Sequence, residues 1–213
     1  MRKIRVLLAD DHKIVLEGLK SLLEPEFDLV GIVEDGKALV KQAERLHPDV
    51  IVADISMPLL NGIEAVRQIK KTNDQIKVVI LTMHPDANYA VKAFDAGASG
   101  YVLKRSATRE LITAIKDAMK DRTYVTPMIA GDLLRAYKST TPGKDVVNKQ
   151  LTSRQEEILQ LLAEGHQTKE IANRLHISPR TVETHKYNIR QELKLNTTAE
   201  LIKYAIKQGI VSI

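Results

Sequence analysis

The first 120 residues repeat one pattern five times, a short apolar run followed by a segment whose apolar residues recur at helical spacing. The five apolar runs are IRVLLAD, DLVGIVE, VIVAD, KVVILT and GYVLK. The central runs are apolar throughout, which predicts strands buried on both faces. Alternating strands and helices with buried strands are typical of a parallel sheet covered on both sides. We therefore predict a doubly wound α/β domain with a five-stranded parallel sheet.

The alternation stops after Lys120, and from Leu151 onward every periodic segment has helical spacing. Between them lies the polar stretch STTPGKDVVNKQ, whose Pro-Gly pair is typical of a linker. The later segments predict an all-α domain of four helices. We place the first domain at 1–122, a linker with a short helix over 128–138 at 123–148, and the helical domain at 149–213.

Composition excludes several classes of protein. The chain has no cysteine, which rules out disulfides and cysteine-bound metals. No apolar run approaches the roughly 18 residues that a membrane helix needs, so we expect a cytoplasmic protein without a membrane partner. The net charge is +5, of which residues 151–213 hold +2 (9 basic minus 7 acidic). Bulk charge therefore marks neither domain as a nucleic-acid binder, and only local pattern can.

Polar side chains follow the predicted strands where each one ends. Asp10 and Asp11 follow the first strand, Asp54 the third, Thr82 the fourth and Lys104 the fifth. Ligands of open α/β sheets bind at the carboxyl ends of the strands, and strands one and three are neighbours in the usual order. We therefore expect the three carboxylates to meet at one edge, where they repel one another unless a cation is present.

The expected cation is Mg²⁺, or Mn²⁺, because both prefer oxygen ligands and keep open water positions. We assign Asp11 and Asp54 as direct ligands, Asp10 as a ligand through water, and the backbone carbonyl of Ser56 as a further ligand. Asp54 is then a candidate nucleophile that forms an acyl phosphate. Lys104 supplies a fixed positive charge for the phosphoryl group, and Thr82 a hydroxyl donor.

The alternative for any single one of these residues is a turn former or a helix cap, which is the commoner role of an acid at a strand end. The combination is harder to explain in that way. Five polar residues stand at the expected strand ends, and Pro58 and Gly62 follow Asp54. The set as a whole therefore favours a phosphoryl site.

Four stretches surround these strand ends, LLADDH, VIVADISMPLLNG, VVILTMH and GYVLKRS. Through them, residues 3–120 resemble the receiver domain of two-component response regulators, a flavodoxin/CheY-like fold. The resemblance implies that a histidine kinase phosphorylates Asp54 and that Mg²⁺ is required. It also implies a switch in which Thr82 turns toward the phosphoryl group and the ring of Tyr101 follows. The alternative for Tyr101 is an ordinary aromatic residue at a strand start.

The segment TKEIANRLHISPRTVETHKYNI has the pattern of a helix-turn-helix. Ser178 can cap the second helix, and Pro179 suits its first turn. An apolar stripe recurs on that helix at Val182, His185, Ile189 and Leu193. We interpret His185 as a core residue rather than as a ligand.

The opposite face of the same helix is polar, as a helix that reads base edges in the major groove requires. The candidate DNA-binding residues are Lys169, Ser178, Arg180, Thr181, Glu183, Thr184, Lys186, Tyr187, Asn188 and Arg190. The basic members are candidates for phosphate contacts. A helical hairpin with a solvated polar face is the alternative.

The stretch from Leu151 to Leu195 is similar to the LuxR-type helix-turn-helix of the NarL/FixJ response regulators. This resemblance implies four helices, of which the third reads DNA and the last often dimerises. The chain has Glu183 where many members have lysine. A carboxylate cannot hold a phosphate, so Glu183 either accepts a hydrogen bond from cytosine N4 or is simply solvated.

We therefore predict a phosphorylation-controlled transcriptional regulator that turns over no separate substrate, with slow autodephosphorylation as its one hydrolytic activity. Its expected partners are a sensor histidine kinase, promoter DNA and a second copy of the chain, with RNA polymerase as a further candidate. One rival is an aspartyl-phosphate phosphatase of the haloacid dehalogenase type, but that chemistry needs a second acid where this chain has Ser56. The other is a phosphorylated adaptor whose helical domain binds a protein.

Overall fold

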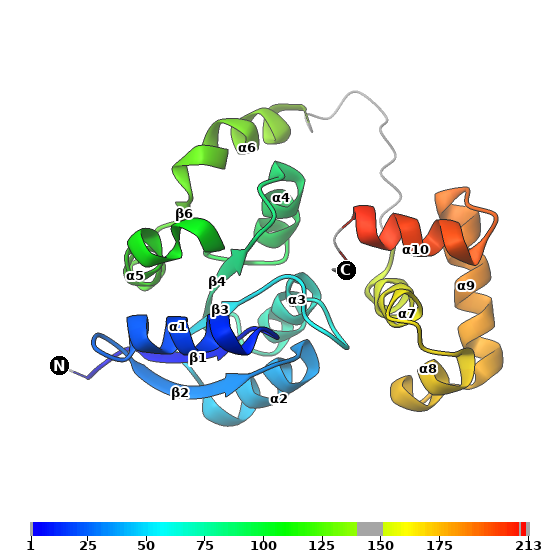
Figure 1. Ribbon diagram of the computed structural model, residues 1–213, viewed down its shortest axis with the longest axis horizontal. Helices are drawn as coiled ribbons and strands as arrows, with labels where there is room; N and C mark the ends of the chain where they lie inside the picture. The colour runs from blue at the N-terminus through cyan, green and yellow to red at the C-terminus, as the bar shows by residue number, and fades with distance from the viewer. Residues whose placement is uncertain (1, 140–150, 209, 212–213) are drawn as a thin grey trace.

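The computed structural model describes residues 2–139, 151–208 and 210–211, and it contains an α/β domain and a helical domain (Figure 1). Residues 140–148 of the predicted linker lie outside the described residues, and the exact domain boundaries stay predictions. The strand order is β2-β1-β3-β4-β5-β6, with every pairing parallel. The predicted doubly wound parallel sheet is confirmed, with one strand more than expected.

The elements of the α/β domain follow the predicted alternation. The strands are β1 (Arg5–Ala9), β2 (Asp28–Val33), β3 (Val50–Ala53), β4 (Lys77–Thr82), β5 (Gly100–Leu103) and β6 (Tyr124–Val125). The helices are α1 (Lys13–Leu23), α2 (Gly36–Leu46), α3 (Gly62–Thr72), α4 (Ala87–Asp95), the 3₁₀ turn η1 (Lys104–Ser106), α5 (Ala107–Ala118) and α6 (Pro127–Ser139).

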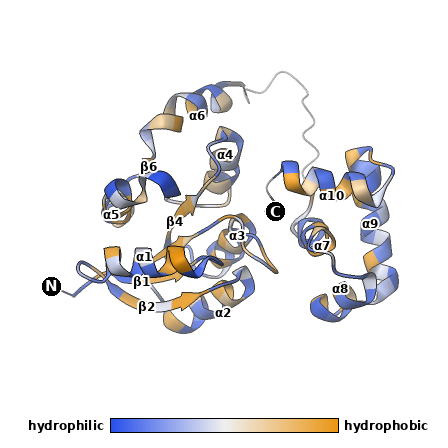
Figure 2. Cartoon of the chain, viewed as in Figure 1, coloured by the Kyte–Doolittle hydropathy of each residue, from blue (hydrophilic) through white to orange (hydrophobic). Residues whose placement is uncertain are grey.

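Both faces of the sheet are covered, which explains why the central strands are apolar throughout. Alternate residues of a strand point to opposite faces. In β1, Leu8 packs in the cluster with α1 and α5, whereas its neighbour Leu7 packs with α2, α3 and α4. Figure 2 shows β1 and β4 as hydrophobic strands among helices of mixed polarity.

The sixth strand lies in the segment that the sequence pattern assigned to the linker. Tyr124 and Val125 pair with the first two residues of β5. The hydroxyl of Thr126 accepts a hydrogen bond from the backbone N–H of Leu103 and donates one to Glu110. The helix α6 then packs against α4 through Ile129 and Leu133. A strand of two residues is too short to produce a recognisable pattern.

The helical domain consists of α7 (Ser153–Ala163), α8 (Thr168–Leu175), α9 (Pro179–Leu193) and α10 (Thr198–Lys207), as predicted. Ser178 caps α9 by accepting a hydrogen bond from the N–H of Thr181 at 3.1 Å, and Pro179 occupies the first turn. In the expected stripe of α9, Val182 and Ile189 are buried. No helix in the described ranges is long and apolar enough to cross a membrane.

Gly62, the first residue of α3, lies against the backbone of Asp54, which follows β3. A Cβ atom at this position would be 1.9 Å from the carbonyl oxygen of Asp54. Backbone cannot give way as a flexible side chain can, so the close approach of α3 to the end of β3 requires glycine.

We expect Gly62→Ala to lower the free energy of unfolding by about 1–3 kcal/mol, because the added methyl group forces the backbone apart. Gly18→Ala is the matched control, since the Cβ atom at Gly18 would meet nothing within 4 Å in α1. The control should raise stability by about 0.5–1 kcal/mol, the usual gain of alanine over glycine in a helix. Urea unfolding followed by circular dichroism measures both. Equal stability of the two variants would contradict the close approach.

Candidate functional site

The parallel register of β1 and β3 brings Asp10 and Asp54 together. Ala9 and Ala53 are register partners, so the two acids leave the sheet side by side. The N–H of Asp54 also donates to the carbonyl of Ala9 at 2.9 Å. Asp10 is 1% exposed and Asp54 4% exposed, so both carboxyl groups are withdrawn from water.

The ammonium group of Lys104 lies between these two acids. Its Nζ atom is 2.6 Å from Asp10 Oδ2 and 2.6 Å from Asp54 Oδ2. The other Asp54 oxygen accepts a hydrogen bond from the N–H of Ile55 at 2.6 Å. Burial raises the pKa of Asp54, and the attraction of Lys104 opposes that rise without cancelling it. Burial alone would lower the pKa of Lys104, but Asp54 and Asp10 outweigh it and the pKa is raised.

Asp11 and His12 complete a cluster at this edge. Ligand atoms of Asp10, Asp11, His12 and Asp54 all lie within 4.8 Å of one another. Three carboxylates supply the oxygen donors that a hard divalent cation prefers, so the donor set fits the expected kind of metal. His12 directly follows the acid pair in the stretch LLADDH, but its residue type alone gave it no predicted role. Its Nδ1 atom lies 2.7 Å from Asp11 Oδ1.

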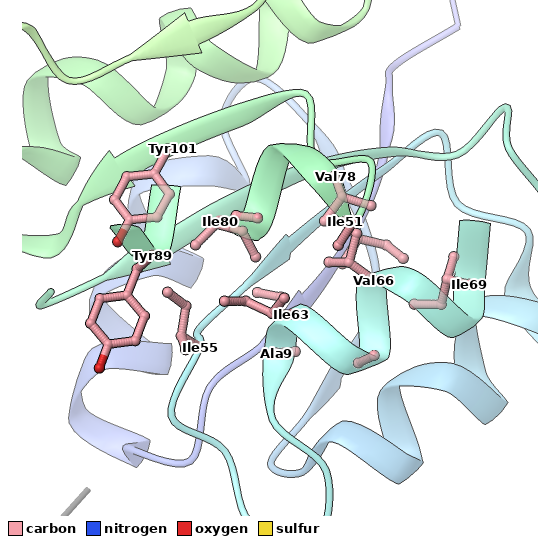
Figure 3. Packing of buried hydrophobic residues seen from close by; sticks show 14 of the residues in the cluster. Ala9, Ile51, Ile55, Ile63, Val66, Ile69, Val78, Ile80, Tyr89 and Tyr101 are labelled. Atoms are coloured by element: carbon pink, nitrogen blue, oxygen red, sulfur yellow. The ribbon is translucent and has the colours of Figure 1, made fainter. Parts of the chain in front are cut away.

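Thr82 and Tyr101 are both fully buried, and both contact His84. The N–H of His84 donates to the Thr82 hydroxyl at 3.3 Å, and the Tyr101 hydroxyl donates to the His84 carbonyl at 2.8 Å. The His84 ring stacks on Tyr89 at 4.7 Å between centroids, and its Nε2 atom is 3.1 Å from the Ser56 hydroxyl. Figure 3 shows Tyr89 and Tyr101 at one end of the packed cluster. The sequence places His84 in the segment 83–88 near the site, which we expect to tune the lifetime of the phosphoryl group, but no pattern predicts these contacts.

The candidate DNA-binding residues lie on α8 and α9 and in the turn between them, at the end of the molecule away from the sheet (Figure 1). Tyr187 is 57% exposed, and Asn188, Thr184 and Arg180 are also exposed. The helical cap uses the Ser178 hydroxyl, which accepts from the backbone as described above. That bond limits what the hydroxyl can offer to DNA.

Glu183 takes part in contacts that neither sequence-based alternative included. Its carboxylate accepts hydrogen bonds from the Thr168 hydroxyl at 2.6 Å and from Lys186 Nζ at 2.9 Å. The bond from Thr168 and then the bond from Lys186 lower the pKa of Glu183. The residue therefore ties the start of α8 to α9 and holds Lys186, whose side chain is 15% exposed. Its expected contact with cytosine stays a prediction.

The fold and the two sites define a class of protein, an α/β module with an acidic edge joined to a helix-turn-helix module. Residues 6–116 match the family described as response regulator receiver domain. Residues 149–205 match the family described as bacterial regulatory proteins, luxR family. The chain belongs to the two-component response regulators of the NarL type, and it is a DNA-binding transcriptional regulator controlled by phosphorylation.

Full-length relatives support this assignment. The chain is 35% identical to the transcriptional regulatory protein DegU of Brevibacillus brevis, over 99% of this chain and 96% of DegU. It is 38% identical to the transcriptional regulatory protein MctR of Rhizobium johnstonii, with the same shares covered. The structure resembles the RcsB response regulator of Salmonella typhimurium, with 27% identity, a TM-score of 0.67 and 100% of both chains covered. Another solved structure contains two RcsB dimers bound to two parallel DNAs, with 28% identity, a TM-score of 0.59 and 95% and 98% covered.

The raised pKa of Asp54 predicts how stability depends on pH. A carboxyl group whose pKa is higher in the folded state than its ordinary value of 3.8 stabilises the fold below pH 3.8, and this stabilisation is lost as pH rises through the raised pKa. We therefore expect Asp54→Asn to be more stable than the parent chain at pH 7, with the difference vanishing toward pH 3.8. Urea unfolding at a series of pH values in EDTA measures it.

The matched control is Asp121→Asn, because Asp121 is exposed and Lys77 lowers its pKa. This change should give no gain in stability at pH 7. A gain of the same size in both variants, or a gain for Asp54→Asn that persists below pH 3.8, would contradict the assignment of the effect to burial of Asp54.

Proposed function

We propose that Asp54 accepts a phosphoryl group from a sensor histidine kinase and that the modified receiver domain changes promoter binding by the helical domain. The observation that carries the proposal is the buried Asp54 carboxylate, held 2.6 Å from Lys104 and beside Asp10. A buried carboxylate beside a fixed ammonium group suits phosphoryl transfer, because the positive charge balances the negative charge of the transferred phosphoryl group.

The chemical step is a transfer between two side chains. An Asp54 carboxylate oxygen attacks the phosphorus of a phosphohistidine on the kinase, a P–O bond forms, and the P–N bond breaks with its electron pair staying on the imidazole. The ammonium group of Lys104 then faces a phosphoryl oxygen, and the Thr82 hydroxyl can donate to another. Slow hydrolysis of the acyl phosphate by water returns the carboxylate, and no separate substrate is turned over.

A divalent cation fits the acidic cluster. Asp10, Asp11, Asp54 and the Ser56 carbonyl would hold Mg²⁺ or Mn²⁺, and the bound ion would neutralise charge on the phosphoryl oxygens. The carboxylates lie close together at the carboxyl edge of the sheet. Among the described residues, the side chains of Lys104 and His12 contact them. The chain's own contribution is to keep these oxygens together by the register of β1 and β3.

We propose that the switch runs through Thr82, His84 and Tyr101. Thr82 and Tyr101 each bond His84, so a Thr82 hydroxyl that turns toward a phosphoryl group releases its bond with the His84 backbone. The consequence is a population shift that favours a dimer and promoter DNA, as in the RcsB complex described above. A regulator that receives its phosphoryl group from a kinase and binds promoters acts in the cytoplasm. RNA polymerase is a further partner there.

We expect Asp54→Ala to abolish labelling of the chain by acetyl phosphate in the presence of Mg²⁺. Without phosphorylation, promoter affinity measured with the donor should fall by about tenfold, within the usual range of coupling between two sites. Phosphate-affinity gel electrophoresis and gel-shift titration measure the two effects. Asp121→Ala, which removes an exposed acid at the opposite edge, is the control and should behave as the parent chain does. Undiminished labelling of Asp54→Ala would contradict the site.

The DNA-binding face gives a second test. Arg180 is exposed at the start of α9, where a positive side chain can reach a phosphate. We expect Arg180→Ala to weaken binding to all DNA sequences alike and to reduce the slope of log affinity against log salt by about one. Fluorescence anisotropy at several salt concentrations measures this slope. Arg109→Ala changes an exposed arginine of the receiver domain and should leave the slope as it was, so equal slopes for all three chains would remove Arg180 from the interface.

A further inference from the structure

The two domains contact each other through α7 and the end of α10. Among the described residues, the hydrogen bonds and ion pairs that join the domains come from α7, from its C-cap and from the end of α10. Figure 1 shows α7 and α10 on the side toward the sheet and α9 on the far side. The contact therefore leaves the polar face of α9 uncovered.

The central feature of this contact is Gln160, a polar residue of α7 with no exposed surface. Its Nε2 atom donates to the carbonyl of Met57 at 2.8 Å and to Glu164 Oε1 at 2.8 Å. Its Oε1 atom accepts from the N–H of Asn61 at 2.7 Å. Both ends of the amide are used, as a buried polar group requires.

Glu164, one helical turn after Gln160, accepts a hydrogen bond from the N–H of Leu59 at 3.1 Å. Three backbone groups of the loop 57–61 are thus satisfied by two side chains of the other domain. Leu59 has a φ of 66°, a left-handed conformation that a leucine adopts only when its surroundings hold it there. Its side chain packs against the hydrophobic cluster of the helical domain.

This loop begins three residues after Asp54, in the connection between β3 and α3. It ends just before Gly62, which lies against the Asp54 carbonyl. A hollow of about 150 Å³ beside the acids is lined by Asp11 and Ser56 and, from the helical domain, by Glu164 and Val211. The helical domain therefore holds the loop and also forms one wall of the hollow that Asp11 and Ser56 line.

We propose that Gln160 and Glu164 form a latch that holds the loop 57–61 and thereby slows phosphoryl transfer to Asp54. The proposal rests on Asp54 being the phosphoryl acceptor. The latch is a positioning device, since neither side chain contacts the carboxylate of Asp54. It acts on the phosphoacceptor loop and not by covering α9, because α9 makes no hydrogen bond or ion pair with the receiver domain in the described part of the chain.

The coupling must work in both directions, because linkage between two equilibria is reciprocal. A change that frees the loop from α7 favours the phosphorylated state, and phosphorylation weakens the hold of α7 on the loop. Promoter DNA that binds preferentially to the released domain therefore speeds phosphorylation of Asp54.

The test is the initial rate at which the full chain is phosphorylated by phosphoramidate with Mg²⁺. We expect Gln160→Ala to raise this rate by about three- to tenfold, the effect of losing one or two hydrogen bonds. Gln75→Ala is the matched control, because Gln75 precedes β4 and so lies at the opposite edge of the sheet. Its rate should equal that of the parent chain. Asp54→Ala in the Gln160→Ala background should show no labelling.

Hydrogen exchange supplies a readout that does not depend on phosphorylation. The amides of Leu59 and Asn61 should be protected in the parent chain and lose that protection in Gln160→Ala. If Gln160→Ala does not fold, Glu164→Ala serves as the second variant, with the same expected directions. An unchanged rate in a folded variant that has lost this protection would overturn the latch alone. A parent chain that is not labelled at Asp54 would overturn the proposed acceptor as well.

Discussion

The placement of a positive charge between two buried carboxylates is the interaction on which the receiver site depends. Asp10 and Asp54 leave neighbouring strands at the same level, and without compensation their charges would repel each other in a poorly solvated space. Lys104 reaches both from the end of β5, which is separated from β1 by β3 and β4. The sheet order is therefore an electrostatic requirement as well as a packing arrangement, because it determines which side chains share the edge.

The loop after Asp54 is where the two domains influence each other. Gly62 permits α3 to begin close to the backbone of Asp54, and Leu59 extends from the same loop into the hydrophobic cluster of the helical domain. Gln160 and Glu164 form hydrogen bonds with three backbone groups of this loop, which lies outside the sheet. The loop 57–61 thus connects the segment that follows Asp54 in the receiver domain to the helical domain.

Local signals predicted most of the elements correctly because they act within a few residues. The hydroxyl of Ser178 and the ring of Pro179 start α9 through bonds and dihedral preferences of their own turn. The strand β6 was missed because its two residues are held by pairing with β5 and by the distant side chain of Glu110. The contacts of His84 could not be predicted for a similar reason, since its partners Tyr101 and Ser56 come from other strands and loops.

The sequence by itself determined the alternation of strands and helices, the acids at the strand ends, the helix-turn-helix and the family. These features follow from periodicity and from residue types whose chemistry is local. The tertiary structure decided that Lys104 bridges Asp10 and Asp54, that Glu183 bonds Thr168, and that Gln160 enters the loop 57–61. Each of these contacts joins residues 15 to 103 positions apart, and only the packed chain brings such residues within hydrogen-bonding distance.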